Sequence, residues 1–235
     1  MAGARTMPRM DRCRSERRAL AGVITAIAAG VMASRVAVAD RDEVDAARID
    51  WAAGRVTAGG TGIADRHAPS PAVALGTSRR GADEAARRRI AAKLGSLPLA
   101  AGGKLADKLA DRSNKARIDA AVEAAITIAA EPETDGSWHV TLAVPIEAIR
   151  QALGEPRVLP PAGDQGLPVV VVEGVAAEPS IGWTVGGVAA ATLWVKEVPA
   201  WTKDAPRAKA RSAKAGAIEV EAHGTAATLY VLVAR

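Results

Sequence analysis

The sequence predicts an α+β protein: an antiparallel sheet with a long helix packed on one face, plus a β-rich C-terminal part. Three observations carry this prediction. A helical pattern runs over residues 71–94, and a polar Asp135-Gly136 turn separates two segments of alternating apolar residues. Short apolar runs separated by turn residues then fill residues 167–235. Since the chain has no Phe and one Tyr, mainly Ala, Val, Leu and Ile must build its core.

We divide the 235 residues into four parts. They are a signal peptide at 1–39, an α+β domain at 40–155, a Pro/Gly-rich segment at 156–166 and the β-rich part at 167–235. The Pro/Gly-rich segment is either a linker between two subdomains or a long surface loop.

Residues 1–39 have the three parts of an export signal. Arginines between Arg5 and Arg18 precede an apolar stretch at 19–33, and Ala37 and Ala39 form a small-x-small cleavage site before Asp40. The apolar stretch is shorter than the roughly 20 residues of a membrane span. We therefore expect cleavage, with an uncleaved anchor as the alternative, and an exported protein that is periplasmic or associated with the outer membrane.

The leader also carries the basic charge of the chain. Residues 1–39 hold seven Arg and two acidic residues, whereas residues 40–235 hold 24 basic and 24 acidic residues. A body without net charge has no general attraction for phosphate polymers, so we expect no nucleic-acid partner. The single cysteine, Cys13, precedes the apolar stretch and would leave with the leader. We expect no lipid anchor, although membrane association stays possible.

A short strand pair begins the α+β domain. Ile49 and Trp51 are expected on one face of the first strand. The return strand contains Gly59, Gly60 and Gly62, whose spacing does not match the G-x-G-x-x-G phosphate loop. We favour the interpretation that these glycines let a helix or a neighbouring strand approach closely.

The long helix has clear start and stop signals. Ser70 is a typical cap, Pro71 suits the first helical position, and Gly95 suits the end after Leu94. The predicted buried stripe is Leu75, Ala82, Ala86, Ile90 and Leu94. The predicted i,i+4 ion pairs on the solvent side are Asp83/Arg87 and Glu84/Arg88.

The segment before the Asp-Gly turn fits two patterns. Helical spacing joins Ile118, Val122 and Ile126, whereas the alternation from Val122 to Ile128 fits a strand. Residues 138–144 alternate clearly, so we favour a β-hairpin.

The remaining elements are short. A helix is expected at 146–153, and the continuous apolar run at 169–172 is typical of a strand covered on both faces. Further runs of strand length stand at 190–198, 217–222 and 227–233.

Part of this pattern resembles a known family. The residues that carry the resemblance are, in order, Trp51, Gly54, Val56, Ala58 and Gly60, the helix from Pro71, and the run at 135–145. Over residues 48–146 the chain resembles exported envelope lipoproteins of the LPP-twenty type, which include the flagellar-associated FlgP proteins. The resemblance implies an α+β domain without enzymatic activity that acts as a scaffold or assembly part. The chain departs from the family in having no cysteine at the cleavage site.

The sequence contains no motif that predicts an enzyme. His67, His139 and His223 include no pair at metal-ligand spacing, and no G-x-S-x-G motif is present. We therefore expect no catalytic residues, no metal and no cofactor.

Three tryptophans are candidate binding residues: Trp183, Trp194 and Trp201. Tryptophan binds sugar rings and protein surfaces well because it offers a large flat area at low entropic cost. In a chain without Phe, however, tryptophan also serves as the bulky core residue, and we favour packing. Of the three, Trp183 stands beside glycines and is the first to test as a binding residue.

Two functions of different class follow. The first is a non-enzymatic exported cell-envelope protein, a scaffold or assembly component that binds envelope proteins or itself through sheet edges and exposed tryptophan. The alternative is a periplasmic binding module for glycan or another small ligand, centred on the three tryptophans.

Overall fold

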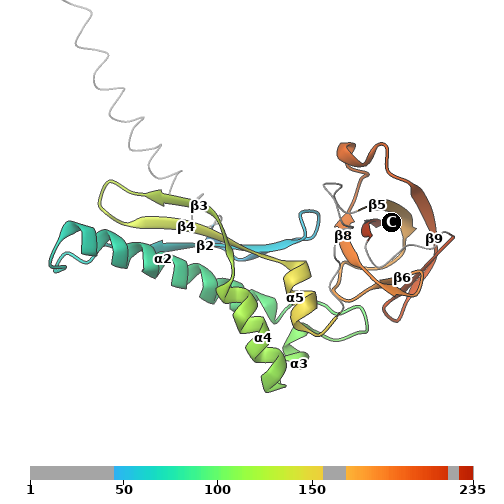
Figure 1. Cartoon of the computed structure of the whole chain (residues 1–235), viewed down its shortest axis with the longest axis horizontal. Coiled ribbons are helices and arrows are strands. Elements are labelled where there is room, and N and C mark those ends of the chain that lie inside the picture. The colour runs from blue at the N-terminus through green and yellow to red at the C-terminus, as the bar shows by residue number, and fades with distance from the viewer. Residues whose placement is uncertain (1–44, 156–167, 222–227, 235) are drawn as a thin grey trace, which may run out of the picture. The chain divides into compact units, whose positions relative to one another are not determined.

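The structure of the protein is a computed structural model that describes residues 45–155, 168–221 and 228–234. The predicted signal peptide, its cleavage site and the Pro/Gly-rich segment at 156–166 lie outside the described residues. Within these residues, helices and an antiparallel sheet precede a second, strand-rich sheet (Figure 1). This arrangement confirms the predicted fold class.

The first sheet contains four antiparallel strands in the order β1-β2-β4-β3. They are β1 (Arg48–Asp50), β2 (Arg55–Gly62), β3 (Ile126–Pro132) and β4 (Trp138–Pro145). The hairpin predicted around Asp135-Gly136 joins β3 to β4, and Gly136 has φ 83°, a conformation that favours glycine. Trp51, which was expected in the first strand, lies in the turn that follows β1.

Helix α2 (Pro71–Leu94) packs against β2 and β4 on one face of this sheet (Figure 1). Both predicted ends are confirmed: the Ser70 hydroxyl accepts a hydrogen bond from the Val73 amide at 3.3 Å, and Gly95 follows the helix. The stripe from Ala82 to Leu94 is buried as expected. Leu75 is instead 40 % exposed, so its place in the stripe was wrong.

Glycines of β2 make the close helix–sheet contact possible. A Cβ atom on Gly60 would overlap the Ala82 carbonyl, and one on Gly62 would overlap the Ser78 carbonyl. The Ser78 hydroxyl donates to the Gly62 carbonyl at 2.6 Å and so fixes this approach. The interpretation that these glycines serve close packing is confirmed.

Three shorter helices complete this part of the chain: α3 (Leu105–Lys108), α4 (Arg112–Glu123) and α5 (Ile146–Ala152). The segment from Ile118 to Ile128, which fitted both a helix and a strand, contains one of each. Helix α4 buries Ile118 and Val122, and β3 begins three residues after α4 ends. The hairpin prediction is therefore right from Ile126 onward and wrong before it. The short helix expected at 146–153 is α5.

The second sheet contains seven strands in the described residues, in the order β7-β6-β10-β9-β5-β11-β8. They are β5 (Val169–Val175), β6 (Thr184–Val185), β7 (Val188–Ala189), β8 (Ala191–Val195), β9 (Arg207–Lys214), β10 (Ala217–Val220) and β11 (Leu229–Ala234). As predicted, β5 is covered on both faces, with Val171 and Val172 in different core clusters.

This second sheet curls back on itself (Figure 1). Its two outermost strands, β7 and β8, are separated in the chain by Ala190 alone. The sheet must therefore bring its two edges together, and its interior is filled by side chains that include Trp183, Trp194 and Tyr230.

Candidate functional site

Strand β3 forms an open edge of the first sheet. Among the described strands it pairs with β4 alone, so one row of its backbone amides and carbonyls is free to pair with another chain. From Ile126 to Ala130 the strand carries no charge, and Ile126 and Ile128 are 58 % and 47 % exposed. A β-bulge between Thr127 and Ala129 leaves Ile128 unpaired with β4.

The opposite edge of the same sheet is protected. Strand β1 is only three residues long and contains charged Arg48 and Asp50. Beyond β1, the Arg89 guanidinium donates to the Gly59 carbonyl at 2.7 Å and lies 3.0 Å from the Asp45 carboxylate. Arg89 thus occupies the part of β2 that β1 leaves unpaired.

The edges of the second sheet are also short or occupied. Strand β7 has two residues, and in β8 the Trp194 amide donates to the Trp51 carbonyl at 3.1 Å. Among the strands that the structure describes, β3 is therefore the longest open edge.

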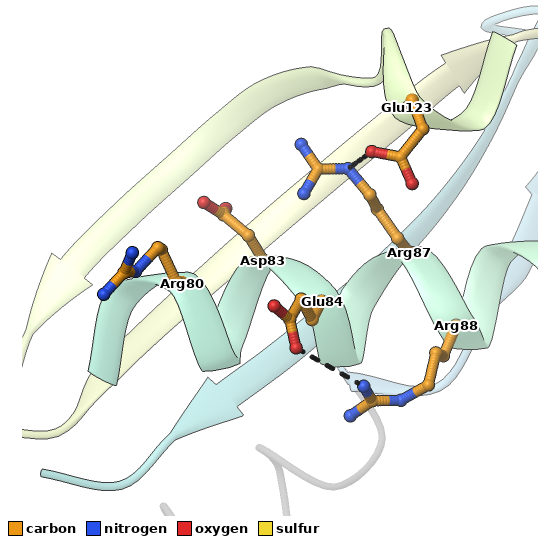
Figure 2. A pocket seen from close by; sticks show the side chains of 6 residues that line it. All are labelled: Arg80, Asp83, Glu84, Arg87, Arg88 and Glu123. Atoms are coloured by element: carbon orange, nitrogen blue, oxygen red, sulfur yellow. Dashed lines mark ion pairs between the residues drawn. The ribbon is translucent and has the colours of Figure 1, made fainter. Parts of the chain in front are cut away.

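A charged groove lies along α2 and reaches Glu123 at the end of α4 (Figure 2). Its volume is about 450 Å³, and it is lined by Arg80, Asp83, Glu84, Arg87, Arg88 and Glu123. The predicted Glu84/Arg88 pair is present at 3.8 Å. Arg87 instead places its Nε 3.6 Å from Glu123 of α4, so its expected pairing with Asp83 was wrong. Three arginines and three carboxylates leave the groove without net charge.

Three residues distant in the sequence meet on the face of the sheet opposite α2. The Thr61 hydroxyl lies 3.4 Å from His139 Nδ1, and His139 Nε2 lies 3.4 Å from the Asp45 carboxylate. This set has the composition of a hydrolase triad. However, the Thr61 hydroxyl also donates directly to the Asp45 carboxylate at 3.4 Å, whereas in a triad the nucleophile and the acid are linked through the imidazole. The contacts fit a structural role, in which Asp45 fixes the chain entering β1.

Two of the three candidate tryptophans are buried. Trp183 and Trp194 are 5 % and 3 % exposed, their ring centroids lie 5.8 Å apart, and Trp183 Nε1 donates to Ser180 Oγ at 2.7 Å. Neither ring offers an open face, which corrects the choice of Trp183 as the first to test. Trp201, in the 3₁₀ helix η1 (Ala200–Thr202), is 60 % exposed.

The remaining candidate residues form no metal site within the described residues. In the part of the chain that the structure describes, no group of three or more His, Cys, Asp or Glu residues could hold a metal ion. His67 is exposed in a loop, and His223 lies outside the described residues. No helix of the described ranges is long and apolar enough to cross a membrane.

Comparisons with known proteins add no relative. No protein-family model matches the chain, and no curated protein matches it.

The sequence predicted binding through sheet edges in general but did not identify β3 as the open edge. The signal available was the alternation that places Ile126 and Ile128 in a strand, but exposure of that strand depends on the order β1-β2-β4-β3, which local sequence does not specify.

Proposed function

We propose that the protein is an exported, non-enzymatic component of the cell envelope that binds protein partners by strand addition to β3. The observation that carries this proposal is the open, uncharged edge at Ile126–Ala130. Strand addition gives affinity through main-chain hydrogen bonds and specificity through side chains at alternate positions. The partners are envelope proteins or further copies of the chain, as expected of a scaffold or assembly part.

The groove along α2 supports this proposal. Its lining includes Glu123, three residues before β3 begins, so a partner bound near the start of β3 would meet charges of both signs, which select among partners. Export is supported by the leader at 1–39, and the intact mass of the native protein tests it: a chain that begins at Asp40 is the expected product.

Photo-crosslinking tests the binding function in the cells that make the protein. Benzoylphenylalanine placed at Ile128 is expected to trap covalent adducts heavier than the chain, because this side chain is exposed on the open edge. The matched control is benzoylphenylalanine at Ile63, which is 84 % exposed but lies outside β3. If Ile128 yields no adduct, or both positions yield the same adducts, the proposal is wrong.

A second candidate function rests on Trp201 alone. Its exposed ring is suited to stack on a sugar, as in a periplasmic glycan-binding module. Trp201→Ala is expected to abolish retention on immobilised glycan if this function is the real one, and Ile128→Lys is expected to leave retention unchanged. A wild-type chain that is not retained rules out this candidate.

A further inference from the structure

The open edge of β3 is complementary to itself. In an antiparallel pairing of two β3 strands about a two-fold axis at Ala129, Glu131 of one copy lies opposite Thr127 of the other. Like charges directly opposite in a strand pair are destabilising, and this pairing contains none within Ile126–Glu131. The exposed isoleucines of each strand then meet uncharged residues.

The groove along α2 has a related property. A two-fold axis brings a surface against its own copy, so a patch of one charge sign would repel itself. The groove instead holds Arg80, Arg87 and Arg88 together with three carboxylates. Its charges are balanced, so it does not oppose a second copy.

The edge of β3 is less protected than the opposite edge of the sheet. The usual protections of an edge strand are charge, proline, a bulge and short length. Strand β3 has a bulge at Ile128, and its charged residue and its proline, Glu131 and Pro132, stand at its end. Within Ile126–Ala130 no charged residue and no proline occurs, whereas β1 at the opposite edge is short and charged.

We infer that the partner of β3 is a second copy of this chain, joined antiparallel through β3 into one eight-stranded sheet. This inference rests on the proposed function, because it names the occupant of the same edge. The strand order of the dimer is β1-β2-β4-β3-β3-β4-β2-β1. The two-fold axis is perpendicular to the sheet, so both α2 helices lie on the same face of the joined sheet.

The mass of the purified protein in solution tests the inference first. Light scattering is expected to give twice the mass of one chain for the wild type and half of that value for Ile128→Lys. The matched control is Ile63→Lys, which makes the same chemical change at an exposed site outside β3 and is expected to stay dimeric. Circular dichroism shows whether each variant is folded.

A cysteine scan tests the geometry of pairing. In the full chain carrying Cys13→Ser, single cysteines are placed in turn from Thr127 to Glu131, with Arg48→Cys in β1 as control. Only a residue near the two-fold axis faces its own copy, so Ala129→Cys or an adjacent position is expected to form a disulfide-linked dimer under mild oxidation. Positions two residues from that site, and Arg48→Cys, are expected to remain unlinked.

The outcomes separate the inference from the proposed function. A wild-type protein that is monomeric at all concentrations, or a dimer that persists in folded Ile128→Lys, overturns the inference. If adducts of a different mass then form at benzoylphenylalanine-128 in cells, the proposed function stands with another partner. A monomer without such adducts overturns both.

Discussion

Tyr230 is the largest of the fully buried side chains among the described residues, and its position makes the protein sensitive to alkaline pH. It lies in β11 within the core of the second sheet and is 1 % exposed. Burial raises the pKa of Tyr230 above its usual value, although a hydrogen bond with Thr228 acts in the opposite direction. The folded state therefore holds the phenolic proton more tightly than the unfolded state does.

This difference predicts how stability changes with pH. Above about pH 10 the unfolded chain ionises its tyrosine while the folded chain keeps it neutral, so the free energy of unfolding falls as pH rises through the two pKa values. Tyr230→Phe is expected to remove this part of the fall, which is checked by urea unfolding between pH 8 and 11. Because the chain contains one Tyr, no other tyrosine can contribute. Identical slopes for the two proteins would contradict the prediction.

Individual residues also show what the sequence could not predict. The meeting of Asp45, Thr61 and His139 joins positions far apart in the chain, and no local pattern announces it. Alternation of side chains along a strand does predict that His139 points away from Trp138 and Val140. Its contacts with Asp45 and Thr61 agree with that expectation. Period-two alternation thus predicts the face of a side chain but not its neighbours.

Among the elements, α2 was the easiest to predict because its signals are local. Ser70, Pro71 and Gly95 mark its ends through their own backbone preferences and hydrogen bonds. The error at Leu75 arises from tertiary structure. Ser78 packs on Gly62, the last residue of β2, so the first two turns of the helix extend past the end of that strand and expose Leu75.

Two glycines on these elements give opposite predictions. Gly62→Ala is expected to destabilise the protein by roughly 1–3 kcal/mol or more, because the new methyl group overlaps the Ser78 backbone. Gly76→Ala, in α2, has nothing within 4 Å of the new methyl group and is expected to stabilise by about 0.5–1 kcal/mol. Denaturant unfolding measures both. Equal effects would mean that helix–sheet contact is not limited by the β2 glycines.

Strand β9 illustrates why some elements were missed. Its sequence alternates Arg or Lys with Ala over Arg207–Arg211 and continues Ser-Ala-Lys, so it lacks the β-branched and aromatic residues typical of strands. Pairing with β10 and β5 on its two sides holds it in the sheet. Tertiary pairing therefore overrides a weak local preference here.

At the scale of the whole molecule, the two sheets share core residues. Ile181, which precedes β6, is buried in the cluster formed around α2, and Trp51 packs against the clusters of both sheets. The Ile181 amide donates to the Pro98 carbonyl at 3.0 Å, and its carbonyl accepts from the Ala100 amide at 2.8 Å. These contacts couple the two parts energetically.

We therefore expect the two sheets to unfold together. Tryptophan fluorescence, which reports on five tryptophans spread over both parts, and far-ultraviolet circular dichroism are expected to give one coincident transition. Ile181 is only 2 % exposed, so Ile181→Ala leaves a cavity in the core. The substitution is expected to lower the free energy of unfolding by about 2–5 kcal/mol and to shift the fluorescence and circular dichroism transitions equally. Two separate transitions in the wild type would show that the sheets are independent domains.

The place of β11 in the second sheet has a consequence for the timing of folding. This strand, Leu229–Ala234, follows the other described strands of the sheet in the chain, yet it lies between β5 and β8 and pairs in parallel with both. Until it is present, β5 and β8 cannot be joined and the curl cannot form. The second sheet therefore depends on pairing between residues far apart in the chain, which makes its closure a late and slow step of folding.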